Sequence, residues 1–310
     1  EGARTWRIGR HGDHSRVQTA EEGRNIVQPR RVQHERPVAG ADDALQSCSN
    51  GSRAAVQLGI GQPVNLGAFI IEEGTEFALL RRIVASMAHE AEAAGVRIVT
   101  GDTKVVERGA ADGVFVTTSG IGVIPPGREM AAHQLQVGDL LLVNGALGDH
   151  GATILAARGD MALSTALQSD CQSLGHLMAA VLNAAPATRA ARDATRGGVA
   201  SVLNEMAQAA KVGIVIDETA LPLRSEVKGM CEILGLDPLY LANEGTLVLG
   251  VPADQAEAAL AAMRSRPEGL AAVRIGRVVG EHPGQVRMTT LFGGSRIVDM
   301  LVGEQLPRIC

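Results

Sequence analysis

Aromatic residues are nearly absent from this chain of 310 residues, which contains one Trp, one Tyr and four Phe. Its core must therefore be built from Ala, Val, Leu and Ile, and it lacks the aromatic platforms on which single-stranded nucleic acids stack. No run approaches the roughly 18 apolar residues of a membrane span. The net charge of −5 comes without any dense run of Lys or Arg. We therefore expect neither a nucleic-acid partner nor a membrane partner.

Cysteine is also scarce, and its four positions follow no zinc or disulfide spacing. They are Cys48, Cys171, Cys231 and Cys310. We interpret them as reduced thiols of a cytoplasmic protein, with Cys171 and Cys231 inert inside helical segments. The opening residues also lack the apolar stretch that follows the positive charges of a signal peptide, which again favours the cytoplasm.

Nucleotide-binding GxGxxG and GxxxxGK[ST] motifs are missing, although strand and helix patterns alternate from about residue 66 onward. This alternation predicts an α/β (α+β) protein with a first domain over 66–126 and a second over 137–290. A polar link punctuated by Pro and Gly, PPGREMAAHQLQVGD, separates the two. In the first domain we predict a helix over 76–95 and, after it, a strand that breaks at Gly101.

Residues 1–65 do not share this regularity. They show no sustained period of 2 or 3.6, and residues 1–60 hold nine arginines and no lysine. Two interpretations remain open for this segment. It is either a disordered tail, as its polar composition suggests, or a frame-shifted stretch upstream of a normal protein.

Two polar clusters lie at the ends of predicted strands: TGDTK follows a strand, and LANEGT precedes one. Strand ends are where open α/β structures bind ligands. In TGDTK, Asp102 and Thr103 could hold Mg²⁺ and Lys104 could meet phosphate oxygens; otherwise the segment is an ordinary turn with a capping Asp. In LANEGT, Glu244 stands beside an apolar strand. Partly apolar surroundings would raise its pKa and suit it to act as a general base, whereas a solvated turn glutamate would do neither.

Two further clusters are rich in glycine and precede predicted helices, so that backbone amides and a helix dipole could meet an anion. In both, plain helix capping is the alternative. The candidate cofactor-binding residues in GALGDHG and DATRGG are Gly148, Asp149, His150, Asp193, Thr195, Arg196, Gly197 and Gly198.

Taken together, GDTKVVERG, GALGDHG, DATRGGVASVLNE, ANEGT and PRIC resemble the HypE family of hydrogenase maturation factors, over about residues 66–310. This family belongs to the ATP-using superfamily of aminoimidazole ribonucleotide synthetase. The resemblance implies a PurM-like ATP-binding architecture of two domains and a flexible C-terminal tail, 299–310, that carries a reactive cysteine. It also implies an ATP-dependent carbamoyl dehydratase. In that family HypF carbamoylates the terminal cysteine, dehydration gives a thiocyanate, and the cyanide passes to HypC–HypD for the Fe(CN)₂CO centre of [NiFe] hydrogenases.

The resemblance also assigns roles to residues of this chain. Cys310 would carry the carbamoyl group, Glu244 would act as the base, and Lys104 would stabilise the phosphate or the activated oxygen. Asp102 and Asp193 would organise Mg²⁺ together with the phosphates of ATP. The implied partners are HypF, the HypC–HypD complex and, where the first domain is intact, a second copy of the chain.

One departure from the family pattern concerns the N-terminal segment. The glycine-rich start, the strand motif with Asp and the Asn-Asp motif of the family are not found in residues 1–65. The resemblance therefore implies an incomplete first domain that exposes apolar surface. Two alternatives to the dehydratase stay open: a small-molecule ATP-dependent synthetase or kinase of the same superfamily, and a catalytically impaired binding protein that docks HypF or HypC–HypD.

Overall fold

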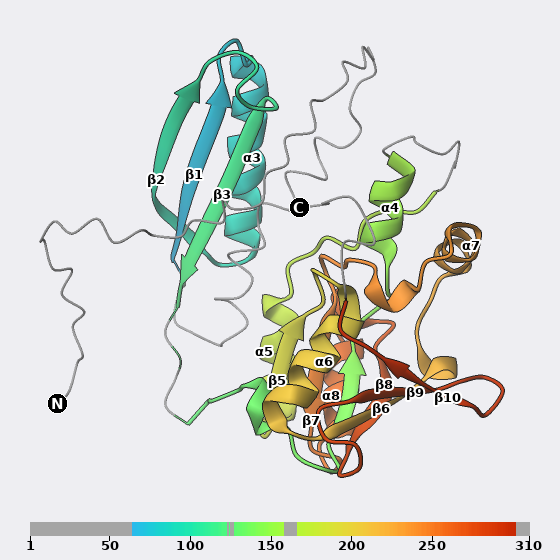
Figure 1. The fold of residues 1–310 in the computed structure, drawn as a ribbon. Coiled ribbons are helices and arrows are strands. Elements are labelled where there is room, and N and C mark those ends of the chain that lie inside the picture. The colour runs from blue at the N-terminus through green and yellow to red at the C-terminus, as the bar shows by residue number, and fades with distance from the viewer. Residues whose placement is uncertain (1–63, 123, 125–126, 158–165, 302–310) are drawn as a thin grey trace, which may run out of the picture. The chain divides into compact units, whose positions relative to one another are not determined.

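The structure is a computed structural model that describes residues 64–122, 124, 127–157 and 166–301. These residues form one sheet of three strands and one of seven (Figure 1). Cys48, Cys310 and the predicted tail from residue 302 onward lie outside the described residues. Within the described ranges, no helix combines the length and the apolar character needed to cross a membrane.

The three-stranded sheet has the order β2-β1-β3, with β2 parallel and β3 antiparallel to the central β1. Its elements are β1 (Val64–Glu72), α3 (Phe77–Ala93), β2 (Arg97–Val106) and β3 (Val114–Ile121). Because parallel neighbours need a long crossover, α3 connects β1 to β2. The helix stops where Gly95 takes a positive φ of 68°, which confirms the predicted end.

Strand β2 does not break at Gly101, so this prediction was wrong. Gly101 pairs with Gly67 of β1, and a Cβ on Gly101 would overlap the carbonyl oxygen of Gly67. Glycine here permits a close approach of two backbones and does not end the strand. Asp102, Thr103 and Lys104 consequently lie inside an exposed strand, not in a loop that follows it.

The part of the described chain that forms the three-stranded sheet, residues 64–124, buries little apolar surface. Its buried hydrophobic residues are Ile83 and Val96. Its exposed large hydrophobic residues are Ile70, Phe77, Val84, Ile98, Val99, Val105, Phe115, Ile121 and Ile124. The exposed apolar surface that was expected for the first domain is therefore present in the described residues.

The seven-stranded sheet has the order β10-β9-β6-β8-β4-β7-β5. Its pairs are antiparallel except for β6 with β9. The strands are β4 (Leu140–Val143), β5 (Ala190–Asp193), β6 (Gly213–Asp217), β7 (Leu247–Val251), β8 (Val273–Val279), β9 (Val286–Thr289) and β10 (Ser295–Val298). The α-helices are α4 (Asp149–Ala157), α5 (Gly175–Ala184), α6 (Gly198–Ala210), α7 (Ser225–Leu234) and α8 (Ala256–Arg264). Short 3₁₀ turns are η1 (Ala132–Gln134), η2 (Glu218–Ala220), η3 (Pro238–Tyr240) and η4 (Pro267–Gly269).

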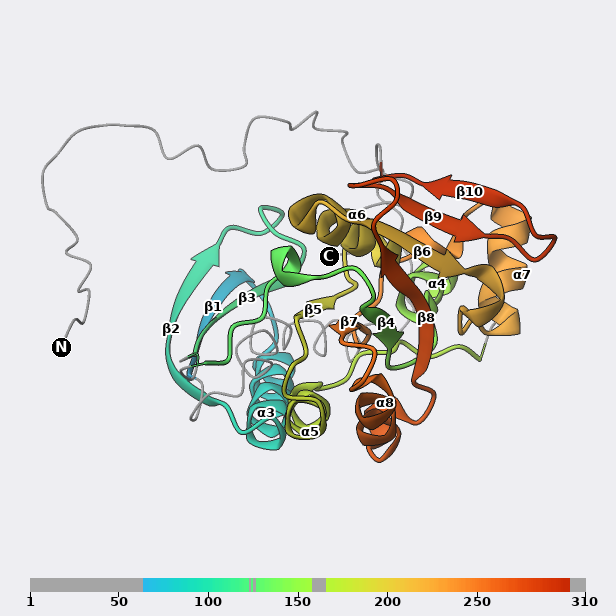
Figure 2. The same cartoon turned by 90° about the horizontal axis from the view of Figure 1, so that it is seen from below.

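Helices pack on both faces of this sheet (Figure 2). On one face, Leu203 and Met206 of α6 pack against inward residues of β6, β8 and β9 such as Ile214. On the other face, α5 and α8 cover β4 and β7, where Met178 and Met263 meet the strand residues. The alternation of strand side chains between the two cores is what fixes the register of the sheet.

Candidate functional site

Three segments meet at one edge of the seven-stranded sheet. Residues 144–151 follow β4. Residues 193–198 begin at the last residue of β5 and continue to the start of α6, and residues 241–247 lead into β7. Because β7 is antiparallel to both β4 and β5, the carboxyl ends of those two strands lie beside the amino end of β7. We call this meeting point the loop junction, and it brings together three of the four predicted clusters.

The Asn243 side chain connects all three segments of the loop junction. Its amide oxygen accepts a hydrogen bond from the Gly148 N–H at 2.7 Å. Its amide nitrogen donates to the carbonyl oxygens of Ala194 and Leu241, both at 3.0 Å. Because Asn243 is only 1% exposed, these bonds form away from water and hold the three backbones at fixed spacing.

Asn144 provides a second buried link within the same junction. Its amide nitrogen donates to the carbonyl oxygens of Gly245 and Glu268, both at 2.9 Å. Its amide oxygen accepts the Leu247 N–H at 2.7 Å. The segment before β7 is therefore bonded to the segment after β4 through side chains as well as through the sheet.

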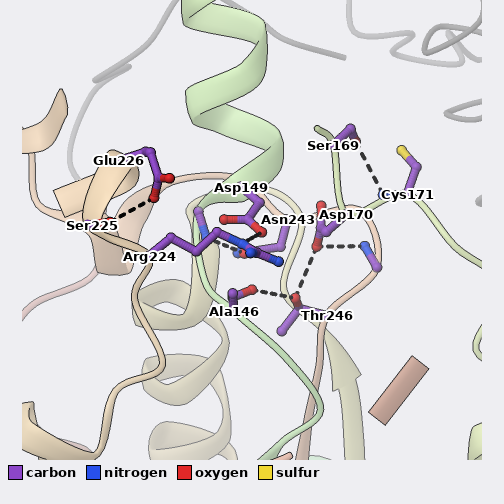
Figure 3. A network of polar contacts seen from close by, with 12 residues as sticks. Ala146, Asp149, Ser169, Asp170, Cys171, Arg224, Ser225, Glu226, Asn243 and Thr246 are labelled. Carbon is purple, nitrogen blue, oxygen red and sulfur yellow. Dashed lines mark hydrogen bonds and ion pairs between the residues drawn. The ribbon is translucent and has the colours of Figure 1, made fainter. Parts of the chain in front are cut away.

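Asp170 fixes the turn that contains Glu244, and the sequence analysis missed it. Its two carboxylate oxygens accept the backbone N–H groups of Glu244 at 2.9 Å and of Gly245 at 3.0 Å. The Thr246 hydroxyl donates to the same carboxylate at 3.0 Å (Figure 3). Asp170 stands in the irregular stretch QSDCQS, which has no periodicity, and its partners lie more than 70 residues away, so no sequence signal identified it.

Glu244 itself is 4% exposed. The alternative of a solvated turn glutamate is therefore wrong for this position. The neighbouring backbone is fixed by Asp170 on one side and by Asn243 on the other. A buried carboxylate in a rigid turn has the placement that a positioned proton acceptor requires.

Asp149 begins α4 and is 4% exposed. One carboxylate oxygen, Oδ2, accepts a hydrogen bond from Arg224 Nε at 2.7 Å (Figure 3), and the other has no hydrogen-bond partner within the described chain. Burial raises the pKa of Asp149, and the charges of Asp170 and Glu226 act in the same direction, while Arg224 opposes them. Asp149 is thus a buried ion-pair partner more than a helix cap.

The other two residues predicted in this cluster have distinct roles. Gly148 has a φ of 81°, and a Cβ there would come within 2.9 Å of Leu241 Cδ1, so the tight turn requires glycine. His150 is 3% exposed, with Nδ1 2.9 Å from Ser169 Oγ. His150 Nδ1 also lies 4.0 Å from the sulfur of Cys171. Cys171 precedes α5 and is not helical, which corrects the sequence prediction. Cys231 does lie in a helix, α7, and its thiol is free.

In the DATRGG segment, Gly197 and Gly198 start α6 with φ values of 68° and 59°. A Cβ on Gly198 would come within 2.5 Å of the Leu241 carbonyl oxygen, so the segment fits against residues 239–241 only with glycine. The glycines at the start of α6 therefore serve packing against residues 239–241, and the anion-binding role expected for them stays a prediction.

The side chains of this segment are more exposed than its backbone. Asp193 ends β5 and accepts a long hydrogen bond of 3.4 Å from the Thr195 hydroxyl. Arg192 lies 3.5 Å from the Asp193 carboxylate. Arg196 is exposed, and it has no ion-pair partner within the described chain. Both Asp193 and Arg196 are therefore accessible to a ligand.

Asp102, Thr103 and Lys104 belong to the three-stranded sheet and are exposed. The Asp102 carboxylate accepts the backbone N–H of Thr103 at 2.8 Å. Strand alternation places Asp102 and Lys104 on one face and Thr103 on the other. No hydrogen bond or ion pair in the described chain connects these residues to the loop junction, and the shared Mg²⁺ site of Asp102 and Asp193 stays a prediction.

A cavity of about 710 Å³ opens beside the loop junction. Its charged lining residues are Asp149, Asp170, Arg224, Glu226 and Glu268. Four carboxylates against one guanidinium make the cavity acidic. It therefore suits a group with N–H donors, such as a carbamoyl amide, better than it suits the phosphates of a nucleotide.

Comparison with known proteins gives the family context of this geometry. The family model "AIR synthase related protein, N-terminal domain" matches residues 51–124, and "AIR synthase related protein, C-terminal domain" matches residues 136–289. The chain is 75% identical over 243 residues to "Carbamoyl dehydratase HypE" of Rhodobacter capsulatus, covering 78% of this chain and 72% of the relative.

Solved structures agree with this relationship. A crystal structure of hydrogenase maturation protein HypE in complex with ATP matches with a TM-score of 0.80 at 42% identity, over 86% of this chain and 81% of that chain. A crystal structure of a HypE–HypF complex matches with a TM-score of 0.77 at 42% identity, over 84% of this chain and 83% of that chain.

Proposed function

The chain belongs to the HypE family of carbamoyl dehydratases, and on this premise we propose that it acts in [NiFe]-hydrogenase maturation by dehydrating a carbamoyl group on its own Cys310. ATP would drive the reaction, and the product would be a thiocyanate. The loop junction carries the proposal, because buried hydrogen bonds connect the three segments that the family resemblance assigns to this chemistry. Relatives in complexes with ATP and with HypF support the choice of nucleotide and of carbamoyl donor.

The chemistry explains why the site needs these groups. An amide oxygen leaves poorly, so it first attacks the γ-phosphorus of ATP, the bond to the leaving ADP breaks, and the oxygen becomes a phosphate ester. The nitrogen then loses its two protons, the C–O bond breaks, and inorganic phosphate leaves. The carbon that remains on the Cys310 sulfur is a nitrile. No oxidant or reductant is required.

Glu244 is the proposed acceptor for the N–H protons. Its turn is fixed by Asp170 and by Asn243, so the carboxylate would need little reorganisation when the carbamoyl group arrives. Lys104 would stabilise the negative charge that develops on the transferred phosphate. Cys310 would supply the thiolate on which the carbamoyl group is carried.

The described residues fit a Mg²⁺ ion only in part. Among them, no group of three or more His, Cys, Asp or Glu side chains could hold a metal ion. Mg²⁺ is nevertheless commonly bound by one or two carboxylates plus phosphate oxygens and water. Asp102 and Asp193 are exposed enough to serve in this way, and bound Mg²⁺ would supply charge neutralisation at the phosphates of ATP.

The later steps follow from the same resemblance. We propose that the thiocyanate donates cyanide to the HypC–HypD complex for the Fe(CN)₂CO centre, and that the chain acts as a homodimer in the cytoplasm. The exposed apolar residues of the three-stranded sheet are compatible with a second copy covering them.

Mass spectrometry of the intact chain tests the reaction directly. After incubation with HypF, carbamoyl phosphate and ATP, carbamoylation of Cys310 should add about 43 Da and dehydration should then remove about 18 Da from the C-terminal peptide. Glu244→Gln keeps the size of the side chain and should stop the reaction after the first mass change.

The matched control is Glu232→Gln, an exposed glutamate of α7 that belongs to none of the three segments of the loop junction. This variant should complete both mass changes. Absence of both changes in the wild-type chain, with HypF shown to be active on another HypE, would refute the proposed function. Completion of the dehydration by Glu244→Gln would leave the function standing and remove Glu244 from its role as the base.

A further inference from the structure

On the seven-stranded sheet, α5 and α8 cover one face at β4 and β7. The same face continues over the neighbouring strands β8, β6 and β9. On these strands Ile214, Val278 and Val286 point into the core beneath α6 and are at most 1% exposed. Their neighbours alternate to the opposite face. Arg277 and Arg287 therefore lie on that opposite face, on either side of the central strand β6.

The register places the two arginines in a single row. Val215 of β6 pairs with Arg277 of β8 and also with Arg287 of β9. Since neighbouring strands are about 4.8 Å apart, the two arginine backbones are about 10 Å apart across β6, within reach of each other's guanidinium groups. Their side chains line a cavity of about 280 Å³, and its other lining side chains include Val279, Glu281, His282 and Gln285.

Within the described chain neither Arg277 nor Arg287 forms an ion pair, although Glu281 stands in the same cavity lining. The Nε of Arg287 is enclosed, and it has no hydrogen-bond partner in the described chain. Enclosing an unpaired charged donor is unfavourable, and a bound anion would remove this cost.

We propose that this cavity, which we call the arginine pocket, binds a phosphate group. Two guanidinium forks match the oxygens and the double charge of a phosphate, and each fork can donate two parallel hydrogen bonds. His282 and Gln285 add polar groups to the lining, which also includes Glu281 and the apolar Val215 and Val279. The cavity admits a phosphate ion or the phosphate end of a monoester, and it is separate from the loop junction and its acidic cavity, with no lining residue in common.

Calorimetric titration of the full chain with inorganic phosphate, at constant ionic strength, tests the site. A saturating non-hydrolysable ATP analogue should be present, so that phosphate binding at the proposed nucleotide site is not measured. Arg277→Gln and Arg287→Gln should each weaken phosphate binding by about tenfold or more, as expected for the loss of a charge-assisted hydrogen bond. A second titration with phosphoserine distinguishes a preference for the free ion from a preference for a monoester.

Arg274→Gln is the matched control. Arg274 is an exposed arginine of β8, the strand that also contains Arg277. It pairs with Leu142 of β4 and does not line the arginine pocket. This variant should bind phosphate like the wild type. Equal phosphate affinity in the wild type, Arg277→Gln and Arg274→Gln, or no measurable binding in the wild type, would overturn the proposal. Because Arg277 is exposed, its substitution decides the question even where Arg287→Gln does not fold.

Discussion

Replacing Asn243 by alanine should destabilise the second domain and loosen the candidate site at the same time. The substitution removes the acceptor of the Gly148 N–H and a donor to the carbonyl oxygens of Ala194 and Leu241. Ala194 keeps a second bond, because the backbone N–H of residue 243 also donates to its oxygen at 3.1 Å. Two buried groups, the Gly148 N–H and the Leu241 carbonyl, therefore lose this partner.

The size of the effect follows from these two groups. A buried polar group without a partner costs about 1–3 kcal/mol, so we expect a loss of about 3–4 kcal/mol in the free energy of unfolding. For a unit of this size, each kcal/mol lowers Tm by about 2–4 °C, which gives a fall of about 10 °C. Asn183→Ala is the control, because Asn183 is exposed on α5, and it should leave Tm almost unchanged.

Hydrogen exchange gives the site-specific measurement. The Gly148 amide is bonded to the Asn243 side chain, so it should lose its protection in Asn243→Ala while amides in the middle of β7 stay protected. An unchanged Tm together with full protection of the Gly148 amide would refute the role assigned to Asn243. A lower Tm with a protected Gly148 amide would show that packing at residue 243 matters and that the hydrogen bond does not.

Two other predictions concern titratable groups. Burial raises the pKa of Cys231 to about 11, so about one thiol in a thousand is ionised at pH 8. Iodoacetamide should therefore leave Cys231 unmodified in the native protein and label it in urea. Labelling of the native protein, detected from the mass of the Cys231 peptide, would contradict this. Burial also raises the pKa of Asp149 above its ordinary value of 3.8, so its contribution to stability is greatest below pH 3.8 and is lost as the pH rises through the raised pKa. Asp149→Asn should lack this decline in denaturation curves recorded from pH 4 to 8, whereas parallel pH profiles of the two proteins would argue against it.

The elements that the sequence predicted correctly carry strong local signals. The helix α3 has helical apolar spacing and a glycine at its end, and α6 follows a double glycine. The strand β7, which was expected beside Glu244, is a short run of Leu, Val and Gly. In each case local preference and tertiary environment favour the same structure, so pattern alone is enough to identify the element.

The missed strands have no such local signal. The sequence of β5 is AARD, and its extended form depends on pairing with β7 from Ala190 opposite Gly250 to Asp193 opposite Leu247. Likewise β10, SRIV, is held by β9 after a glycine turn. The error at Gly101 arose because the local signal was misleading. Glycine usually interrupts strands, but here it lies inside β2, because the backbone of Gly67 comes too close to leave room for a Cβ. Tertiary context overrides local preference at these positions.

The candidate site shows the same division. Glycines and charged residues marked three segments of the loop junction, because glycine clusters are visible locally. The residues that hold the segments together, Asn243 and Asp170, were not singled out. Apart from the nearby Leu241 carbonyl, the hydrogen-bond partners of the Asn243 side chain lie 49 and 95 positions away, and those of Asp170 lie 74 to 76 positions away. A single asparagine or aspartate has no sequence pattern that reports partners at such separations.

This arrangement has a consequence for the proposed base. Glu244 is adjacent to Asn243 in the chain, and Asn243 is bonded to the turns that contain Gly148 and Ala194. A displacement of either turn must therefore strain or break a buried hydrogen bond next to Glu244, at a cost of about 1–3 kcal/mol. The position of the carboxylate is thus energetically coupled to the backbone before α4 and to the backbone before α6. A ligand that fixes the glycines before α6 would also restrict Glu244, and this coupling requires no contact between that ligand and the carboxylate.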